Sequence, residues 1–293
     1  MLKGSYVALI TPFLEDGSVN YDKLKELIEY HINSQTDGIV LLGTTAEAST
    51  LSLEEQEKIV KFSLGIIGKR VPVVIGAGSN DTAVAIQKAK LFSSLGADYL
   101  LVITPYYNKT NTNGLIHHFE SIAMSSRVPI ILYNVPSRTG MSIPLSAIEK
   151  LSKNPNICGI KEASGNMSYA VAVSKYCNES FVMLSGNDDS IVPLMSIGAK
   201  GVISVLANIC PNQTHTLCKF CLEEKYELAR KLQIKLLPIA DALFLETNPI
   251  PVKAAMNDLG FEVGGYRMPL YEMDKEAHKK LTAILKESKE LLV

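Results

Sequence analysis

The segment Tyr99-Leu100-Leu101-Val102-Ile103 is hydrophobic at every position, without the alternation of a strand that faces water on one side. Continuous runs of this length are typical of strands buried on both faces, as in parallel sheets covered by helices. Seven further short runs share this character, at residues 6–10, 38–42, 71–75, 129–133, 157–161, 181–185 and 201–205. The sequence therefore predicts eight buried strands.

The stretches between these runs carry helical spacing. Leu24, Leu27 and Ile28 fall on one face of a helix, and Ser52 with Glu55 forms the pattern of a capping box. Strand starts recur every 20 to 33 residues, which leaves room for a helix between successive strands. Eight such units predict an α/β fold, a (β/α)8 TIM barrel, rather than an open doubly wound sheet.

The strand pattern stops near residue 222. Three helical stretches follow, at residues 223–246, 251–259 and 275–291, and no low-complexity linker precedes them. Pro249 and Pro251 stand where a helix could begin, because proline fits the first helical turn. We expect a catalytic barrel over residues 1–222 and a C-terminal helical region over residues 223–293 that packs on it.

Composition excludes several classes of partner. The 293 residues include 29 basic and 30 acidic side chains, so the net charge of −1 gives no electrostatic reason to expect a nucleic acid or an anionic membrane. No apolar stretch approaches the roughly 20 residues of a membrane span, and the first residues lack the core of a signal peptide. The five cysteines are odd in number, so we expect reduced thiols and a cytoplasmic protein.

In a TIM barrel the active site lies at the carboxyl ends of the strands. Small and polar residues follow the predicted strands at that end. They include Gly43-Thr44-Thr45, Thr104-Pro105-Tyr106-Tyr107, Tyr133-Asn134, Lys161-Glu162 and Gly186-Asn187-Asp188. We therefore look for chemistry among these residues.

Lys161 ends the apolar run 157–160, so its stem would lie at the rim of a hydrophobic barrel. Desolvation disfavours the ammonium form, and a neutral amine is the nucleophile that condenses with a carbonyl. The alternative is a lysine paired with Glu162 or reaching solvent. Lys69 and Lys200 precede strands, which places them at the opposite end of the barrel, where a structural role is expected.

Four other residues at or after the carboxyl ends of predicted strands are candidates for a functional role. Tyr133 could exchange protons with an imine-forming lysine, or be a core aromatic with a bonded hydroxyl. Thr44 and Thr45 could hold a carboxylate through hydroxyls and amides, or serve only the turn. Arg138 could clamp a carboxylate bidentately, or be solvated on its loop.

Two further patterns carry little functional signal. Cys218 and Cys221 form a lone C-x-x-C without the second ligand pair that a structural zinc site needs. Asp188 and Asp189 are expected to cap a helix. We expect no metal site at either place.

Taken together, the quoted residues resemble those of a known family. The matching motifs are Gly43-Thr44-Thr45-Ala46-Glu47, Tyr106-Tyr107, Tyr133-Asn134-Val135-Pro136-Ser137-Arg138-Thr139-Gly140, Gly159-Ile160-Lys161-Glu162 and Asn248-Pro249-Ile250-Pro251-Val252-Lys253. In this order they resemble the dihydrodipicolinate synthases, within the N-acetylneuraminate lyase family of pyruvate-dependent class I aldolases. The resemblance spans nearly the whole chain.

The resemblance implies a lyase of lysine biosynthesis by the diaminopimelate route. Its substrates would be pyruvate and L-aspartate-4-semialdehyde, its product 4-hydroxy-tetrahydrodipicolinate, and it would need neither a metal nor an organic cofactor. It also implies a homotetramer built as a dimer of dimers, although a dimer alone would complete the site.

The resemblance further implies a role for each matching residue. Lys161 would form the imine with pyruvate, and Tyr133, Thr44 and Tyr107 would relay protons, with Tyr107 supplied by a neighbouring subunit. The substrate-binding positions would be Thr45 for the pyruvate carboxylate, Arg138 for the semialdehyde carboxylate, and the backbone carbonyls of Gly186 and Ile203.

Two departures from the family pattern concern a turn and an effector cleft. Ala46 replaces a glycine but leaves both threonine hydroxyls in place. Lysine-inhibited members use a histidine pair and a glutamate in an allosteric cleft, and the matching positions here are Leu53, Gln56 and Val84. Asn80 and Tyr106 of that cleft remain. Without the carboxylate that would meet an ammonium, we expect weak or absent inhibition by lysine.

Three alternatives stay open at this point. The chain could be another pyruvate-dependent aldolase of the same family, similar to N-acetylneuraminate lyase. It could be a barrel that handles phosphosugars without covalent catalysis, since strand-end glycines can cradle phosphate. It could also be an inactive barrel that serves in assembly, against which the joint presence of the five candidate side chains argues.

Overall fold

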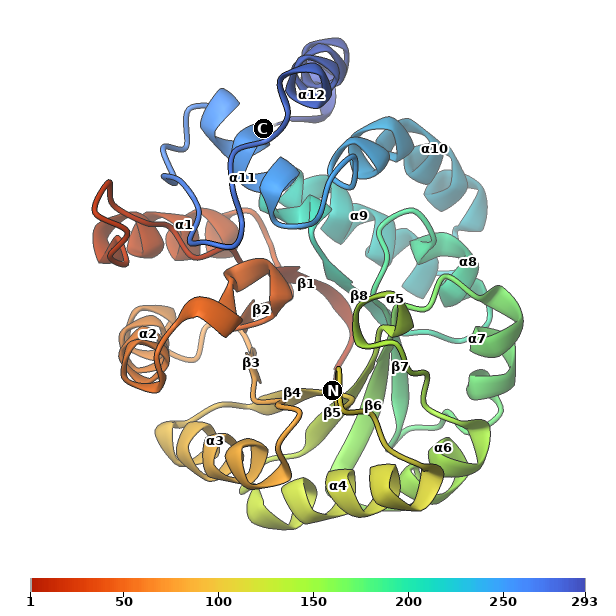
Figure 1. Ribbon diagram of the computed structural model, residues 1–293. Coiled ribbons are helices and arrows are strands. Elements are labelled where there is room, and N and C mark those ends of the chain that lie inside the picture. Colours follow the sequence, from red (N-terminus) through yellow and green to blue (C-terminus); the bar gives the residue numbers. More distant parts are fainter. Residues whose placement is uncertain (1, 293) are drawn as a thin grey trace.

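The strands close into a barrel with parallel pairing throughout, as the computed structural model shows for residues 2–292 (Figure 1). The eight strands are β1 Gly4–Ala8, β2 Gly38–Leu41, β3 Val73–Gly76, β4 Tyr99–Ile103, β5 Ile130–Asn134, β6 Ile157–Glu162, β7 Val182–Ser185 and β8 Gly201–Ser204. Their order in the sheet follows the chain, and β1 pairs with β8 to close the barrel. The predicted (β/α)8 barrel is confirmed, with strand boundaries shifted by one or two residues.

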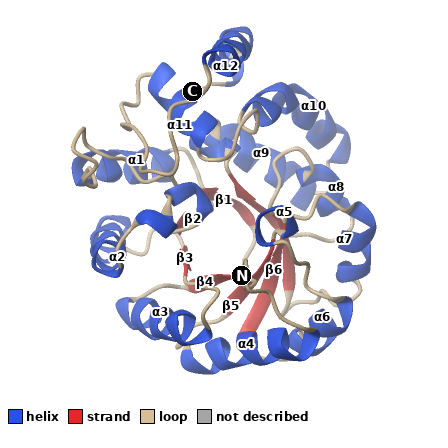
Figure 2. Cartoon of the chain, in the orientation of Figure 1, coloured by secondary structure: helices blue, strands red, loops and turns tan. Residues whose placement is uncertain are grey.

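Helices surround the strands on the outside, as Figure 2 shows. The α-helices are α1 Tyr21–Asn33, α2 Leu53–Ile67, α3 Thr82–Leu95, α4 Thr112–Ser125, α5 Pro136–Thr139, α6 Leu145–Leu151, α7 Met167–Ser174, α8 Ile191–Ser196, α9 Pro211–Leu222, α10 Tyr226–Ala242, α11 Ile250–Asp258 and α12 Lys275–Glu287. Four 3-10 helices are also present, at Thr44–Ala46, Ala48–Thr50, Leu206–Asn208 and Lys289–Leu291.

Local sequence signals set several helix ends. The predicted capping box is present at α2, where the Ser52 side chain accepts from the Glu55 amide and the Glu55 carboxylate accepts from the Ser52 amide. Gly68 ends the same helix in the left-handed conformation, which glycine adopts without strain. These signals fix the two ends of α2, so that the residues between β2 and Ser52 stay outside this helix.

The core has two layers because strand residues alternate between the two sides of the barrel wall. Apolar side chains such as Ile39, Ile75 and Val102 pack outward against the helices. The inward-facing set includes Val40, Val74 and Leu101, and it extends toward the mouth with Tyr133 and Ile203. The inner layer thus forms an apolar floor beneath the polar strand ends.

The C-terminal region forms the three predicted helices, α10, α11 and α12. In Figure 1 α12 lies outside the ring of barrel helices, and it packs against α10 and α11. Lys253, in α11, is fully buried and bonds to Glu47 in the loop after β2. The C-terminal region is therefore tied directly to the mouth of the barrel.

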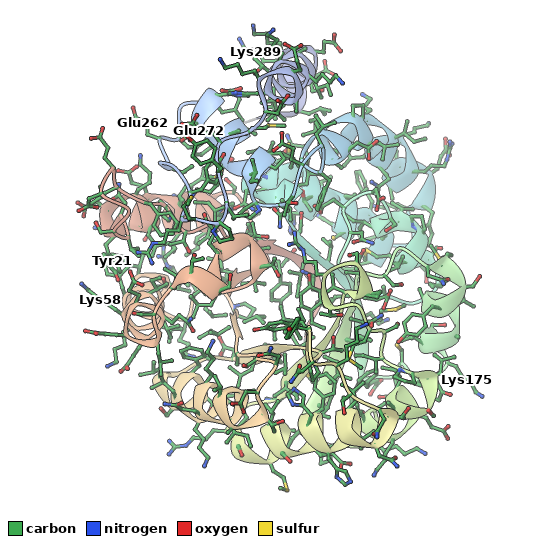
Figure 3. The ribbon with its side chains drawn as sticks, viewed as in Figure 1. Tyr21, Lys58, Lys175, Glu262, Glu272 and Lys289 are labelled. Atoms are coloured by element: carbon green, nitrogen blue, oxygen red, sulfur yellow. The ribbon has the colours of Figure 1, made fainter. Side chains whose placement is uncertain are left out.

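Charged side chains such as Lys58, Lys175 and Glu262 lie on the outer surface, where Figure 3 labels them. On this surface the ammonium of Lys58 lies 4.8 Å from the centroid of the Tyr21 ring, between α2 and α1. Across residues 2–292, no helix combines the length and apolar character needed to cross a membrane. The same residues contain no group of three side chains arranged to hold a metal ion.

The expected helix cap at Asp188 and Asp189 is wrong. Helix α8 begins after Ser190, and no side-chain cap bond forms there. The Asp188 carboxylate instead accepts the backbone N–H groups of Val205 and Leu206, at 3.0 and 2.9 Å, at the start of the 3-10 helix after β8. It joins two neighbouring strand ends rather than starting its own helix.

Candidate active site

A cavity of about 530 Å³ opens at the carboxyl ends of the strands. It is lined by seven of the eight residues predicted to bind or react with substrate. They are Thr44, Thr45, Tyr133, Arg138, Lys161, Gly186 and Ile203. Because these residues come from five different strand ends, the barrel itself brings them together.

Lys161 lies near the end of β6 and is 7% exposed. Its register partner on β5 is Tyr133, and its Nζ lies 4.4 Å from the centroid of the Tyr133 ring. Among residues 2–292, no side chain or carbonyl forms a hydrogen bond or ion pair with this Nζ. The amine is therefore in contact with an aromatic face and unpaired, which leaves it available to a ligand in the cavity.

Glu162 does not pair with Lys161, contrary to the structural alternative. Its carboxylate accepts the side-chain amide of Asn134 at 2.7 Å and the backbone N–H of Ser164 at 2.7 Å. Burial raises the pKa of Glu162, and the bonds to Ser164 and Asn134 oppose this rise. Glu162 thus braces β5 against β6 directly beside the Tyr133–Lys161 pair.

Gly186, after β7, makes room for the lysine. A Cβ atom at this position would lie 3.0 Å from Lys161 Cε and 2.5 Å from the Cβ of Ala163. Any larger residue would push the lysine stem or the β6 end out of place. The close approach of Ala163 therefore requires a residue without a side chain at Gly186, and the lysine stem lies beside the same position.

Thr44 and Thr45 form the first turn of a 3-10 helix directly after β2. Thr45 is buried, and its Oγ1 accepts a hydrogen bond of 2.9 Å from Nδ2 of Asn248. Ala46 keeps a negative φ, while the left-handed conformation falls on Glu47 with φ 55°. The methyl group of Ala46 therefore meets no backbone strain, and the departure from the glycine pattern leaves the turn intact.

Arg138 lies in the short helix α5 rather than on an open loop. The side chain is exposed, yet its Nη2 donates to the backbone carbonyl of Asn248 at 2.9 Å. This bond holds the guanidinium against the cavity wall and leaves its other donors free. Arg138 is therefore positioned to meet an anion at the mouth.

Tyr107 is not brought to the cavity within the chain. Its side chain is 92% exposed and its backbone has φ 71°, an uncommon value for a non-glycine residue. A second cavity, of about 210 Å³, lies between Thr44 and Tyr106 and shares Tyr133 and Arg138 with the first. The structure thus leaves an open space next to Thr44 and projects an aromatic side chain away from the molecule.

The positions that match the effector cleft carry no carboxylate. Leu53 is half-buried and Val84 is exposed, and both are apolar. The Gln56 amide already donates to the backbone carbonyls of Ala48 and Leu51, at 3.0 and 2.9 Å. Asn80 donates to the Tyr106 carbonyl at 3.3 Å. None of the described residues that line the second cavity is acidic.

Sequence reasoning missed the contribution of the C-terminal region to the cavity wall. Phe244, Glu246 and Asn248 follow α10 and line the cavity. The motif that begins at Asn248 carries a family resemblance but no signal of its place in the fold. No spacing rule could place it beside Thr45, 203 residues away. Asp188 was predicted as a helix cap and not as a residue that joins two strand ends, where burial of its carboxylate raises its pKa.

The two cysteines of the C-x-x-C pattern are enclosed in the packing around one helix. Cys218 and Cys221 lie in α9, are buried, and are free thiols. Burial raises the pKa of Cys221 to about 11 and that of Cys218 further. Neutral buried thiols of this kind behave as small apolar side chains.

A TIM barrel with an unpaired lysine among hydroxyl groups at its mouth has the arrangement that a barrel enzyme needs to bind a carbonyl substrate as an imine. A family model, described as the Dihydrodipicolinate synthetase family, matches residues 1–288. The chain belongs to this family.

Individual relatives agree with the family match. The 4-hydroxy-tetrahydrodipicolinate synthase of Clostridium perfringens (strain SM101 / Type A) is 51% identical over 275 residues, which cover 94% of each chain. The crystal structure of dihydrodipicolinate synthase from Aquifex aeolicus superposes with a TM-score of 0.96 and 42% identity, over 99% of each chain. A structure of the Cyanidioschyzon merolae enzyme with lysine bound has a TM-score of 0.95 and 32% identity, over 98% of each chain.

Proposed function

We propose that this chain condenses pyruvate with L-aspartate-4-semialdehyde to give 4-hydroxy-tetrahydrodipicolinate, the product for which its curated relatives are named. The observation that carries the proposal is the unpaired Lys161 amine at the barrel mouth, next to the Tyr133 ring. Family membership supports the same reaction. The enzyme would serve lysine biosynthesis in the cytoplasm, which the five free cysteines favour.

The first half of the reaction forms a nucleophile from pyruvate. The Lys161 amine attacks the C2 carbonyl, and water leaves to give a protonated imine, which withdraws electrons from the neighbouring methyl group. A proton then leaves that methyl group and an enamine forms. Tyr133 and Thr44 line the cavity and carry hydroxyls suited to move these protons.

The second half joins the two substrates. The enamine carbon attacks the aldehyde, and the resulting alkoxide takes up a proton. The amine of the semialdehyde then attacks the imine carbon and closes the ring, which releases Lys161 as the free amine. Thr45 and Arg138 would hold the two substrate carboxylates, and the carbonyls of Gly186 and Ile203 would face the bound intermediates.

Reduction with borohydride in the presence of pyruvate tests the covalent step. We expect a stable adduct on Lys161, located by peptide mass spectrometry, because borohydride converts the imine to a secondary amine. Lys253, which is also buried but is paired with Glu47, is the internal control and should stay unmodified. An unmodified chain would exclude the imine mechanism. A coupled assay with L-aspartate-4-semialdehyde then tests whether this aldehyde is the second substrate.

The same proposal includes assembly into dimers, and into a tetramer as a dimer of dimers. Tyr107 is 92% exposed, and the cavity beside Thr44 is open within the chain. Insertion of Tyr107 from a second copy would bury this side chain and bring its hydroxyl to Thr44, which completes the proton relay. Aromatic residues of this kind are typical anchors of protein interfaces.

Mixed subunits test this exchange. Tyr107→Phe and Lys161→Ala chains should each be inactive or nearly so, since each lacks one component of every site. Refolded together, they should regain part of the activity, because a hybrid dimer contains one site with Lys161 from one copy and Tyr107 from the other. Absence of regained activity in verified hybrid dimers would show that Tyr107 does not serve the site of the second copy, and a fully active Tyr107→Phe chain would place it outside the site.

A further inference from the structure

Asn248 contacts both of the side chains to which the proposed function assigns substrate carboxylates. Its side-chain Nδ2 donates to Thr45 Oγ1 at 2.9 Å, and its backbone carbonyl accepts from Arg138 Nη2 at 2.9 Å. Asn248 is 5% exposed and lines the larger cavity. One residue of the C-terminal region therefore joins two separate strand ends of the barrel at the mouth.

The direction of the bond to Thr45 determines what the threonine hydroxyl can do. A hydroxyl has one hydrogen to donate and two lone pairs that accept. Because the Asn248 amide donates to Thr45 Oγ1, the hydroxyl hydrogen remains free to donate elsewhere. A carboxylate accepts hydrogen bonds and donates none, so it needs a hydroxyl held in this orientation.

The position of Asn248 is itself fixed by neighbouring contacts. It precedes α11, whose Lys253 is anchored to Glu47 at 2.9 Å in the loop that also carries Thr45. The backbone around Asn248 is thus fixed in position relative to the loop after β2. Loss of the Asn248 side chain removes the bond to Thr45 but leaves the backbone bond to Arg138.

We propose that Asn248 is a positioning residue for the keto-acid substrate. Its amide holds the Thr45 hydroxyl as a donor toward the carboxylate of pyruvate, and its carbonyl keeps Arg138 at the mouth for the second carboxylate. This inference rests on the proposed function, because it assumes that pyruvate binds next to Lys161.

Steady-state kinetics of Asn248→Ala separate this role from a general structural one. We expect KM for pyruvate to rise about tenfold, as for a weakened bond to a charged group, with kcat changed less than about threefold. KM for the semialdehyde should stay within about twofold, because the Arg138 bond goes to the backbone. Equal increases in both KM values, or none, would overturn the inference.

Asn248→Asp is a second variant of nearly identical shape that keeps an acceptor and loses the donor. The Thr45 hydroxyl would then turn toward the new carboxylate, so KM for pyruvate should rise at least as much as in Asn248→Ala. Asn187→Asp adds the same charge to the wall of the same cavity, and in the structure the Asn187 side chain bonds to neither Thr45 nor Arg138. A similar rise in both Asp variants would assign the effect to charge alone and overturn the inference.

A double-mutant cycle with Thr45→Val tests whether Asn248 acts through the threonine. Once the hydroxyl is gone, Asn248→Ala should add less than about twofold to KM for pyruvate, because residues that act as a unit are not additive. Full multiplication of the two effects would contradict the proposal. Borohydride trapping of the wild-type chain tests the proposed function separately. If the wild type is trapped but KM for pyruvate is unchanged in Asn248→Ala, the proposed function stands and only this inference fails.

Discussion

Two buried lysines of this chain lie in opposite electrostatic surroundings. Lys161 is 7% exposed and Lys253 is fully buried, and the ammonium of each lies 4.4 Å from an aromatic centroid, that of Tyr133 or Phe13. Lys253 Nζ donates to the Glu47 carboxylate and to two backbone carbonyls, whereas Lys161 Nζ has no bonded partner within residues 2–292. The two lysines are thus alike in burial and differ in having a bonded partner, and we expect this difference to decide which of them reacts.

The buried carboxylates near these lysines show the same contrast. Glu47 lies 2.9 Å from Lys253 and also accepts the backbone N–H of Arg267. Asp188 bonds to two backbone N–H groups at the ends of β7 and β8, while the charge of Lys161 only partly offsets the rise in the Asp188 pKa caused by burial. One lysine is held by a direct ion pair that fixes the fold, and the other is left free at the mouth.

Removal of the free lysine should have the largest effect on activity. Lys161→Ala is expected to lower kcat/KM by at least about 10³-fold, as for other residues that carry a covalent step. The melting temperature should change little or rise, because the side chain forms no bond in the fold. Kinetics and thermal unfolding of the same preparation check both halves, and an active Lys161→Ala enzyme would end the comparison.

Removal of the paired lysine should act on stability instead. Lys253→Met leaves the Glu47 carboxylate buried without its partner, which typically costs about 3–5 kcal/mol. For a chain of this size the melting temperature should fall by roughly 10 °C. Burial lowers the pKa of Lys253, and the Glu47 carboxylate partly offsets this fall. The charged form of the lysine therefore depends on its direct contact with Glu47.

Two further variants keep this stability prediction specific. Lys69→Met removes an exposed ion pair with Asp98 and should change the free energy of unfolding by less than about 1 kcal/mol. The double variant Lys253→Met/Glu47→Leu should recover part of the stability lost in Lys253→Met, because it leaves no unpaired charge. A Lys253→Met chain as stable as the wild type would show that the ion pair does not support the fold.

The contrast also explains which parts could be predicted from the sequence. Lys161 and Tyr133 could be found because a continuous apolar run has a fixed direction, and a barrel puts every strand end on one face. The Lys253–Glu47 pair and the Asn248–Thr45 bond join residues more than 200 positions apart, which no periodic pattern encodes. Asp188 was expected to cap its own helix because short-range capping rules ignore the next strand, whose amides it accepts.

Within the described chain, the buried carboxyl group of Asp188 has no lysine bonded to it, and we expect it to make the stability of the fold depend on pH. Its pKa is raised in the folded chain, so its contribution to stability is present below the ordinary carboxyl pKa of about 3.9 and is lost as pH rises through the folded value. Asp188→Asn cannot ionise and still offers an oxygen to both backbone N–H groups. Its melting temperature should therefore gain on that of the wild type by a few degrees between pH 4 and pH 7. Parallel curves would contradict the raised pKa.

Inhibition by free lysine should be the smallest of these effects. To bind tightly, its ammonium group needs a carboxylate partner, as the ammonium of Lys253 has in Glu47. The effector-cleft positions Leu53, Gln56 and Val84 supply none, and no described residue lining the adjacent cavity is acidic. We expect millimolar lysine to change activity by less than about twofold. Half-inhibition at sub-millimolar lysine would contradict this. Val84→Glu places a carboxylate at a position that matches the cleft and should increase the sensitivity to lysine, whereas Val171→Glu, at another exposed valine, in α7, should not. A response to both variants would show that added surface charge, rather than a partner for the ammonium, governs binding.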